Sequence, residues 1–222
     1  MTKENNKRIK VSKDGPYIVS GNIPINHLEY IPDNHGASIE YKETGKYPEK
    51  ATCGLCRCGK SQNKPYCDGS HLQGFDGTET ARHAAYDEMA EHIKGKQMDL
   101  MDAEELCAGA RFCDTKGGTW NLVTRSDYPQ AKDIIEYQCT HCPSGRLTAV
   151  TKEGKRIEPD LPREISIIED VAAHKEGPIW VKGGIEIEDS TGKIYPSRNR
   201  VTLCRCGKSE NKPFCDGSHM EK

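Results

Sequence analysis

Long apolar segments are missing from this sequence of 222 residues. No window approaches the roughly 18 to 20 apolar residues that span a membrane, so we expect no membrane partner. No apolar stretch resembling a signal peptide follows Met1, because residues 1–13 are polar and basic. We therefore expect a soluble protein of the reducing cytoplasm, where cysteines stay as thiols or bind metal.

Hydrophobic and aromatic residues are scarce, at 34% and 6% of the chain, which is little for one large core. Glycine, proline and cysteine are plentiful instead, with 21, 12 and 11 residues. Small domains with little core usually need a disulfide or a metal, and a reducing compartment favours metal. The composition therefore predicts about two or three small domains that bind metal.

Charge of one sign does not dominate the chain, because 32 basic residues stand against 34 acidic residues for a net charge of −2. This balance gives no electrostatic reason to expect nucleic acid as a partner. The sequence also contains no phosphate-binding loop, dinucleotide fingerprint, nucleophile elbow or kinase signature, so we expect no enzyme and name no catalytic residue. Five histidines form no set with ligand spacing: His27, His35, His83, His92 and His174.

A repeated segment of sixteen residues is the main feature that the chain does contain. Cys56–His71 reads CRCGKSQNKPYCDGSH and Cys204–His219 reads CRCGKSENKPFCDGSH, so the copies differ at only two positions. Each copy offers three thiolates and one imidazole, which suit one metal centre but leave zinc and iron–sulfur both open. The candidate ligands are Cys56, Cys58, Cys67 and His71 in the first copy, and Cys204, Cys206, Cys215 and His219 in the second.

The order of residues within each copy resembles the motif of the CDGSH iron–sulfur family, the NEET or mitoNEET-like proteins. This resemblance implies a [2Fe–2S] cluster in each copy, with two cysteines on the inner iron and one cysteine with the histidine on the outer iron. A single imidazole ligand implies a potential between those of all-cysteine and Rieske centres. We also hypothesise that mild acid releases the outer iron, because protons compete with metal for the histidine.

The repeat extends upstream of the cysteines. Gly15–Ile25 is echoed by Gly177–Ile187, and both segments have the pattern of a β-hairpin. We predict a third strand at Ile39–Lys42 in the first copy and at Asn199–Leu203 in the second. The extra residues of the first copy, around His27–Tyr47, are predicted as a loop. Each unit alone has exposed edges and half a core, so we predict that the two units stack as an intramolecular pseudo-dimer.

Four further cysteines lie between the copies. The spacing of Cys107 and Cys113, followed by Cys142 before Pro143, resembles a divergent single-cluster ferredoxin-like domain, which implies a [4Fe–4S] or [3Fe–4S] cluster. Cys139 forms C-x-x-C with Cys142 and is assigned as the fourth ligand by its chemistry, with His141 as the alternative. The residues alone leave open a zinc knot or buried thiols. We also predict a short helical stripe from Tyr86 to Ile93, a helix from Asp127 to near Cys139, and a hairpin over Leu147–Ile157.

Together these features predict an α+β fold, a small β-rich NEET-like pseudo-dimer of two CDGSH repeats with an inserted ferredoxin-like α+β domain. The predicted domains are a flexible tail (1–14), a first CDGSH domain (15–75), a ferredoxin-like domain (76–158) and a second CDGSH domain (159–222).

The leading functional prediction is a monomeric iron–sulfur protein that transfers electrons to and from redox partner proteins. One alternative is cluster storage, redox sensing or cluster transfer to apo iron–sulfur acceptor proteins. The other is an interaction module stabilised by zinc.

Overall fold

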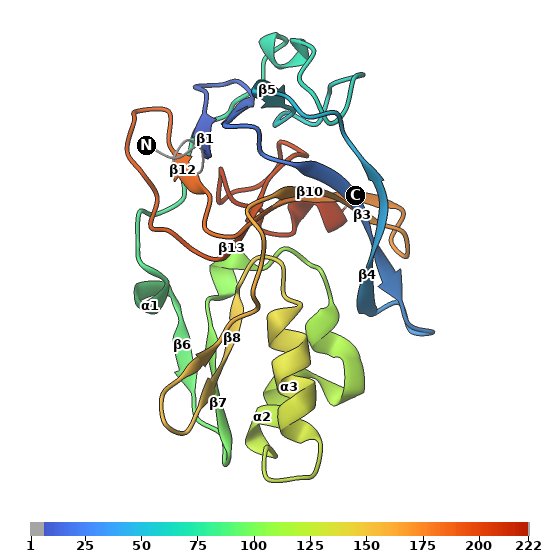
Figure 1. Cartoon of the computed structure of the whole chain (residues 1–222), viewed down its shortest axis with the longest axis vertical. Helices are drawn as coiled ribbons and strands as arrows, with labels where there is room; N and C mark the ends of the chain where they lie inside the picture. Colours follow the sequence, from blue (N-terminus) through green and yellow to red (C-terminus); the bar gives the residue numbers. More distant parts are fainter. Residues whose placement is uncertain (1–6, 222) are drawn as a thin grey trace.

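The computed structural model describes residues 7–221 of the chain. These residues form three β-sheets, two in an upper body and one in a lower body that also carries helices α2 and α3 (Figure 1). We call residues 7–75 the first repeat, 76–158 the insert and 159–221 the second repeat. The architecture is β-rich, as predicted, and no helix among the described residues is long and apolar enough to cross a membrane.

The upper body contains one sheet of order β12–β1–β2–β5 and another of order β13–β11–β10–β3–β4. The strands of the first repeat are β1 (Arg8–Val11), β2 (Tyr17–Ser20), β3 (Ile25–Pro32), β4 (Ser38–Lys46) and β5 (Thr52–Leu55). Those of the second repeat are β10 (Ile165–Asp170), β11 (Lys175–Lys182), β12 (Glu186–Glu188) and β13 (Arg200–Leu203). The predicted flexible tail over residues 1–14 is wrong for β1, which pairs with β2 and β12. Residues 1–6 of that tail lie outside the described residues.

The second repeat contributes β12 to the sheet of the first, and the first repeat contributes β3 and β4 to the sheet of the second. Strand β12 runs parallel to β1, with Ile187 beside Ile9, and β3 runs parallel to β10, with Ile25 beside Ile165. Within each repeat, β2 pairs with β5 and β11 pairs with β13, in both cases antiparallel. The two repeats thus use their strands in the same way, and each sheet includes a strand of the other repeat.

An apolar core lies between these two sheets. Strands β1 and β2 bury alternate residues, as expected for strands with one face on a core. The buried cluster includes Ile9, Val19 and Leu55 from one sheet and Ile167 and Leu203 from the other. Burying an aliphatic side chain of this size contributes about 1.5–3 kcal/mol, so this shared core holds the two repeats together.

The extra segment of the first repeat is a β-hairpin, so its prediction as a loop over His27–Tyr47 is wrong. Strands β3 and β4 pair over most of their length, with Tyr30 opposite Tyr41. The predicted third strand at Ile39–Lys42 lies inside β4, and the strand that precedes the first metal ligands is β5. The insert covers this hairpin, because the rings of Tyr30 and Phe112 lie 5.7 Å apart in a second buried cluster.

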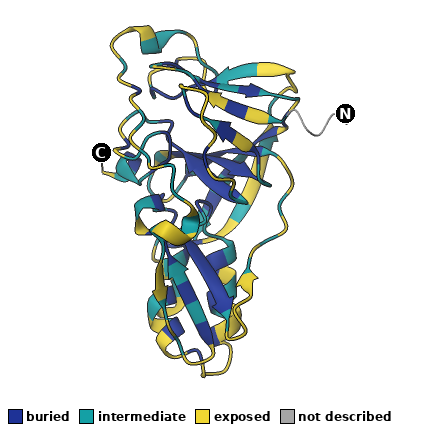
Figure 2. Cartoon of the chain, turned by 90° about the vertical axis from the view of Figure 1, so that its left-hand side faces the viewer, coloured by how far each residue is buried: buried dark blue, intermediate teal, exposed yellow. Residues whose placement is uncertain are grey.

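The insert consists of a sheet of order β6–β7–β8–β9 with α2 and α3 against it, and its interior is buried (Figure 2). The predicted helix after Pro129 is confirmed as α3, and the predicted hairpin is confirmed as β8 with β9. The helical stripe at Tyr86 is only one turn long, because the chain then enters β6 and pairs with β7. The elements are α1 (Tyr86–Met89), β6 (Glu91–Ile93), β7 (Met98–Asp102), α2 (Thr119–Thr124), α3 (Ala131–Thr140), β8 (Leu147–Thr151) and β9 (Arg156–Ile157).

Candidate metal centres

Two loops of nearly identical sequence follow the last strand of each repeat. The first metal loop, Cys56–His71, follows β5, and the second metal loop, Cys204–His219, follows β13. In each loop, one backbone hydrogen bond closes the loop on itself and another joins it to the preceding strand. The N–H···O distances are 2.8 Å (Cys56 to Pro65) and 2.9 Å (Cys67 to Gly54) in the first loop, and 2.9 Å for Cys204 to Pro213 and for Cys215 to Thr202 in the second.

The four donor side chains of each loop stand in two pairs. In the first metal loop the Sγ atoms of Cys56 and Cys58 lie 3.8 Å apart, and Cys67 Sγ lies 3.2 Å from His71 Nδ1. The histidine follows its cysteine closely because the chain turns into a 3₁₀ helix at Ser70–Leu72. The second metal loop has the same arrangement, with distances of 3.7 Å (Cys204 to Cys206) and 3.4 Å (Cys215 to His219 Nδ1).

These spacings fit pairs of ligands on a shared tetrahedral metal. Two thiolates at about 2.3 Å from one tetrahedral ion lie about 3.8 Å apart, and the Cys56 and Cys58 sulfurs show that spacing. Among residues 7–221, no three His, Cys, Asp or Glu side chains are placed to hold one metal ion. Two pairs of donors in each loop are compatible with a two-metal cluster such as [2Fe–2S].

Local hydrogen bonds favour a thiolate in the second metal loop. A hydrogen bond from the Cys206 thiol lowers the pKa of Cys204 to about 6 against the opposing effect of burial, and the backbone N–H groups of Ser209 and Gly207 lower it further. The thiolate is the form of cysteine that binds metal. The Cys206 thiol and the backbone N–H groups together favour the thiolate of Cys204.

The second metal loop is more deeply buried than the first. Cys215 and His219 are only 2% and 8% exposed, whereas Cys67 and His71 are half-buried. Burial lowers the pKa of His219 to about 4 and raises the pKa of the Cys215 thiol. The surroundings of the two loops therefore differ although their sequences almost coincide.

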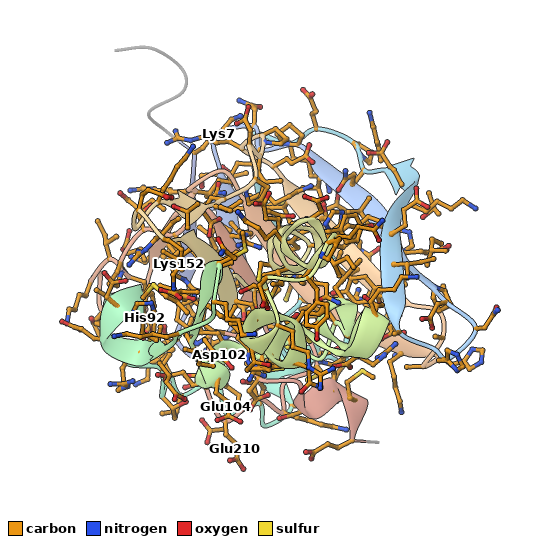
Figure 3. All side chains as sticks on the ribbon, turned by 90° about the horizontal axis from the view of Figure 1, so that it is seen from below. Lys7, His92, Asp102, Glu104, Lys152 and Glu210 are labelled. Atoms are coloured by element: carbon orange, nitrogen blue, oxygen red, sulfur yellow. The ribbon has the colours of Figure 1, made fainter. Side chains whose placement is uncertain are left out.

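The insert provides this extra cover. Arg111 of the insert forms an ion pair with Asp170 of β10 at 2.8 Å, and Asn211 of the second metal loop donates to the Glu105 carbonyl at 2.8 Å. Figure 3 shows Glu104 of the insert and Glu210 of that loop on the same edge of the molecule. Beside the first metal loop, by contrast, Leu72 is 82% exposed.

The two metal loops touch each other through a pair of glycines. Gly59 and Gly207 have φ angles of +77° and +79°, a conformation that favours glycine. A β-carbon on Gly59 would lie 2.7 Å from the Cys206 carbonyl oxygen, and one on Gly207 would lie 2.7 Å from that of Cys58. This reciprocal approach brings the backbone of Cys58 in one loop close to the backbone of Cys206 in the other.

Three of the four middle cysteines line one cavity. Cys107, Cys113 and Cys142 line a cavity of about 30 Å³, partly open to solvent, together with residues 108–112. Burial raises the pKa of the Cys113 thiol, and the nearby Asp114, Cys142 and Cys107 raise it further. A cationic iron–sulfur core would offset the negative charge of three neighbouring thiolates. This donor set suits a cluster with three cysteine ligands.

The structure does not bring Cys139 or His141 into that cavity. Cys139 is fully buried on α3 in the apolar cluster with Met98, and burial raises the pKa of its thiol. The His141 ring stacks on Tyr137 with centroids 3.8 Å apart, and its Nδ1 lies 2.7 Å from the Tyr137 carbonyl oxygen. Neither side chain lines the cavity, although the apolar cluster of Cys139 also packs against Cys113 and Cys142.

Two buried arginines beside the ligands were not predicted as part of the sites. Arg57 donates to the Ser12 carbonyl at 3.1 Å, and Arg205 donates to those of Gly177 and Ile168 at 2.7 Å each. Each arginine thus anchors its metal loop to the strands beneath. The sequence does contain a signal for them, because C-R-C occurs in both copies although metal binding needs only the cysteines.

Comparisons with known proteins agree with this geometry. Residues 14–72 and 176–220 match the family model described as iron-binding zinc finger, CDGSH type. Residues 93–152 match the model described as divergent 4Fe–4S mono-cluster, and this segment contains all four middle cysteines. Searches of curated proteins and of solved structures found no match.

Proposed function

Because the chain carries two CDGSH iron-binding regions with a divergent 4Fe–4S mono-cluster region between them, it is an iron–sulfur cluster-binding protein, and we propose that it transfers single electrons through three clusters. Each metal loop would hold one [2Fe–2S] cluster through its three cysteines and one histidine. The cavity of the insert would hold a [4Fe–4S] or [3Fe–4S] cluster. When bound, these clusters supply one-electron oxidation and reduction.

Contact between the three ligand-bearing segments is the observation that carries this proposal. A β-carbon on Gly217 in the second metal loop would lie 3.3 Å from the Cys107 carbonyl oxygen of the insert. The second metal loop also touches the first, through Gly207 and the Cys58 carbonyl. The order of contacts is therefore insert, second metal loop, first metal loop. We propose that an electron from a donor protein moves along this series, in either direction, to an acceptor protein.

The exchange of strands supports an intramolecular pseudo-dimer of the two repeats. Pairing of β12 with β1 and of β3 with β10 gives each repeat the partner strand that a second chain would otherwise supply. We therefore propose that the chain works as a monomer, with redox proteins as partners. We assign it no catalytic turnover.

Metal analysis and spectroscopy of anaerobically purified protein test the proposal. We expect about eight iron atoms and as much sulfide per chain, from two dinuclear clusters and one four-iron cluster. Electron paramagnetic resonance during a redox titration should resolve three centres that each accept one electron. Stoichiometric zinc without iron, or clusters that are not reduced at accessible potentials, would overturn the proposal.

Cluster transfer to apo acceptor proteins is a second candidate, favoured by the half-buried pair of Cys67 and His71. Replacing the imidazole by a thiolate, as in His71→Cys, should lower the cluster potential and strengthen iron binding. If cluster transfer is the function, His71→Cys should slow transfer to apo-ferredoxin, whereas the matched variant His219→Cys at the buried site should change it little. An unchanged transfer rate in His71→Cys would argue against this function.

The third cluster is tested by a pair of cysteine variants. Cys142 lines the cavity and Cys139 lies in the apolar core, so we expect Cys142→Ala to remove one cluster's iron and Cys139→Ala to retain it. Because alanine is close in size to cysteine, Cys139→Ala should cost only about 1 kcal/mol in unfolding free energy. Iron counts and the spectrum of the third centre measure the outcome. Loss of that centre in Cys139→Ala would instead make Cys139 its fourth ligand.

A further inference from the structure

A cavity separate from the three ligand sets opens between the insert and the second repeat. Its volume is about 200 Å³, and it is partly open to solvent. Three arginines from two different segments line it, together with hydroxyl and amide groups. The lining includes Tyr86, Thr148, Arg156 and Glu158 from the insert, and Arg198, Asn199 and Arg200 from the second repeat.

Arg198 is the unusual member of this lining. The Nη1 atom of its guanidinium is buried and has no hydrogen-bond partner among residues 7–221. The guanidinium lies over the ring of Phe214, whose centroid is 5.3 Å from Cζ. Burial lowers the pKa of Arg198 to about 10. A desolvated cation without an anion is costly, so a bound anion would stabilise this site.

The charges of the other two arginines differ in how they are balanced. Arg200 is matched by Glu158, which accepts from its Nε and Nη2 at 2.9 Å each. Arg156 pairs with Asp87, but both side chains are about half exposed and such surface pairs contribute little. Arg156 can therefore turn toward a ligand at small cost. The cavity thus offers two guanidinium charges without a buried carboxylate to balance them.

A phosphate group matches this charge better than a carboxylate does. It carries about −1.5 to −2 at pH 7, against −1 for a carboxylate, and its oxygens accept hydrogen bonds from arginine forks. We propose that this cavity binds a phosphate group, either of inorganic phosphate or of a small phosphomonoester, with Arg198 and Arg156 as its cationic contacts. Because Arg200 donates to the Cys142 carbonyl at 2.8 Å, the ligand would lie one side chain away from the ligand loop of the insert.

The first repeat also has a cationic side chain at the position equivalent to Arg198. That residue provides a matched control. Counting back from the aligned metal loops, Arg198 corresponds to Lys50 and Phe214 to Tyr66. The Lys50 ammonium also lies over its aromatic ring, 3.8 Å from the Tyr66 centroid, but Lys50 is exposed and lines none of the cavities described for the insert. The cation over the ring is thus common to both repeats, whereas the buried guanidinium in a cavity occurs where the insert meets the second repeat.

Titration calorimetry on the cluster-loaded full chain, in buffer free of phosphate and sulfate, tests the proposal. We expect saturable binding of inorganic phosphate or of AMP, one per chain, with a dissociation constant tighter than about 1 mM. The tighter of the two identifies the source of the phosphate group. Sodium chloride at matched ionic strength should give no saturable signal. Failure of both phosphate and AMP to bind would overturn the proposal whether or not the clusters transfer electrons.

Variants then assign the binding to the cavity. We expect Arg198→Gln to weaken binding at least tenfold and the matched variant Lys50→Gln to leave it unchanged. Arg198→Lys keeps the charge over Phe214 but loses the fork, so an intermediate loss is expected. Arg156→Gln, at an exposed side chain that folding does not require, should also weaken binding. Equal binding by wild type, Arg198→Gln and Arg156→Gln, or an equal loss in Lys50→Gln, would overturn the assignment.

Discussion

At the scale of single residues, two buried tyrosine hydroxyls differ in whether they have a hydrogen-bond partner. The Tyr17 hydroxyl donates to the carbonyl of Cys204 at 2.7 Å, so a side chain of the first repeat supports a ligand of the second metal loop. The Tyr66 hydroxyl is buried without a hydrogen-bond partner among the described residues, and the second repeat has Phe214 at the equivalent position. The first hydroxyl should therefore stabilise the fold, whereas the second should not.

We expect Tyr17→Phe to lower the unfolding free energy by about 1–3 kcal/mol, because it leaves the buried Cys204 carbonyl without this donor. Tyr66→Phe makes the same chemical change and should be neutral or slightly stabilising, because it removes a buried hydroxyl that lacks a partner. Chemical denaturation of both variants beside the wild-type protein measures the difference. Equal losses of stability in the two variants would contradict this interpretation.

At the scale of elements, the two metal loops depend on glycines whose surroundings differ. Gly207 has a positive φ and faces the Cys58 carbonyl, whereas Gly69 has a φ of +93° with nothing within 4 Å of its missing β-carbon. We expect Gly69→Ala to cost about 1–2 kcal/mol from backbone strain alone. Gly207→Ala adds a steric clash and should cost about 2–5 kcal/mol. Thermal unfolding, followed by visible absorbance and circular dichroism, compares them, and equal costs would show that the loop contact is unimportant.

The strands and metal loops differ in how well the sequence predicted them. The exact repeat of donors predicted both metal loops, and Asn199–Leu203 was predicted within one residue of β13. The equivalent strand β5 was missed, although Tyr47-Pro48 and Tyr195-Pro196 stand at matching distances before their loops. The exchange of β3 and β12 could not be predicted, because alternation of apolar residues identifies a strand but not its neighbour. The β3–β4 hairpin was also missed, since its apolar face is covered by Phe112 from a distant part of the chain.

At the scale of the whole molecule, the insert breaks the symmetry of the repeats. It covers the second metal loop through Gly109 and Met220, where a β-carbon on Gly109 would lie 3.0 Å from Met220 Cγ. The residue equivalent to Met220 in the first repeat is Leu72, which is 82% exposed. Two nearly identical ligand sets therefore differ in access to solvent. In the electron relay that we propose, this difference would let the first metal loop contact partner proteins and would place the second metal loop between the insert and the first.

We expect a water-soluble iron chelator to remove iron from the two metal loops in two phases, fast from the half-buried pair at Cys67 and His71 and slow from the buried pair at Cys215 and His219. Met220→Ala should open the covered site and speed the slow phase roughly tenfold, the effect of about 1.4 kcal/mol of lost cover. The matched variant Leu72→Ala should leave both phases unchanged, because its side chain already lies in solvent. Stopped-flow absorbance measures both rates, and Cys67→Ala, which lacks a ligand of the first set, should lose the fast phase. A single rate for both loops would mean that the insert does not protect the second site, and that access is controlled by the loops themselves.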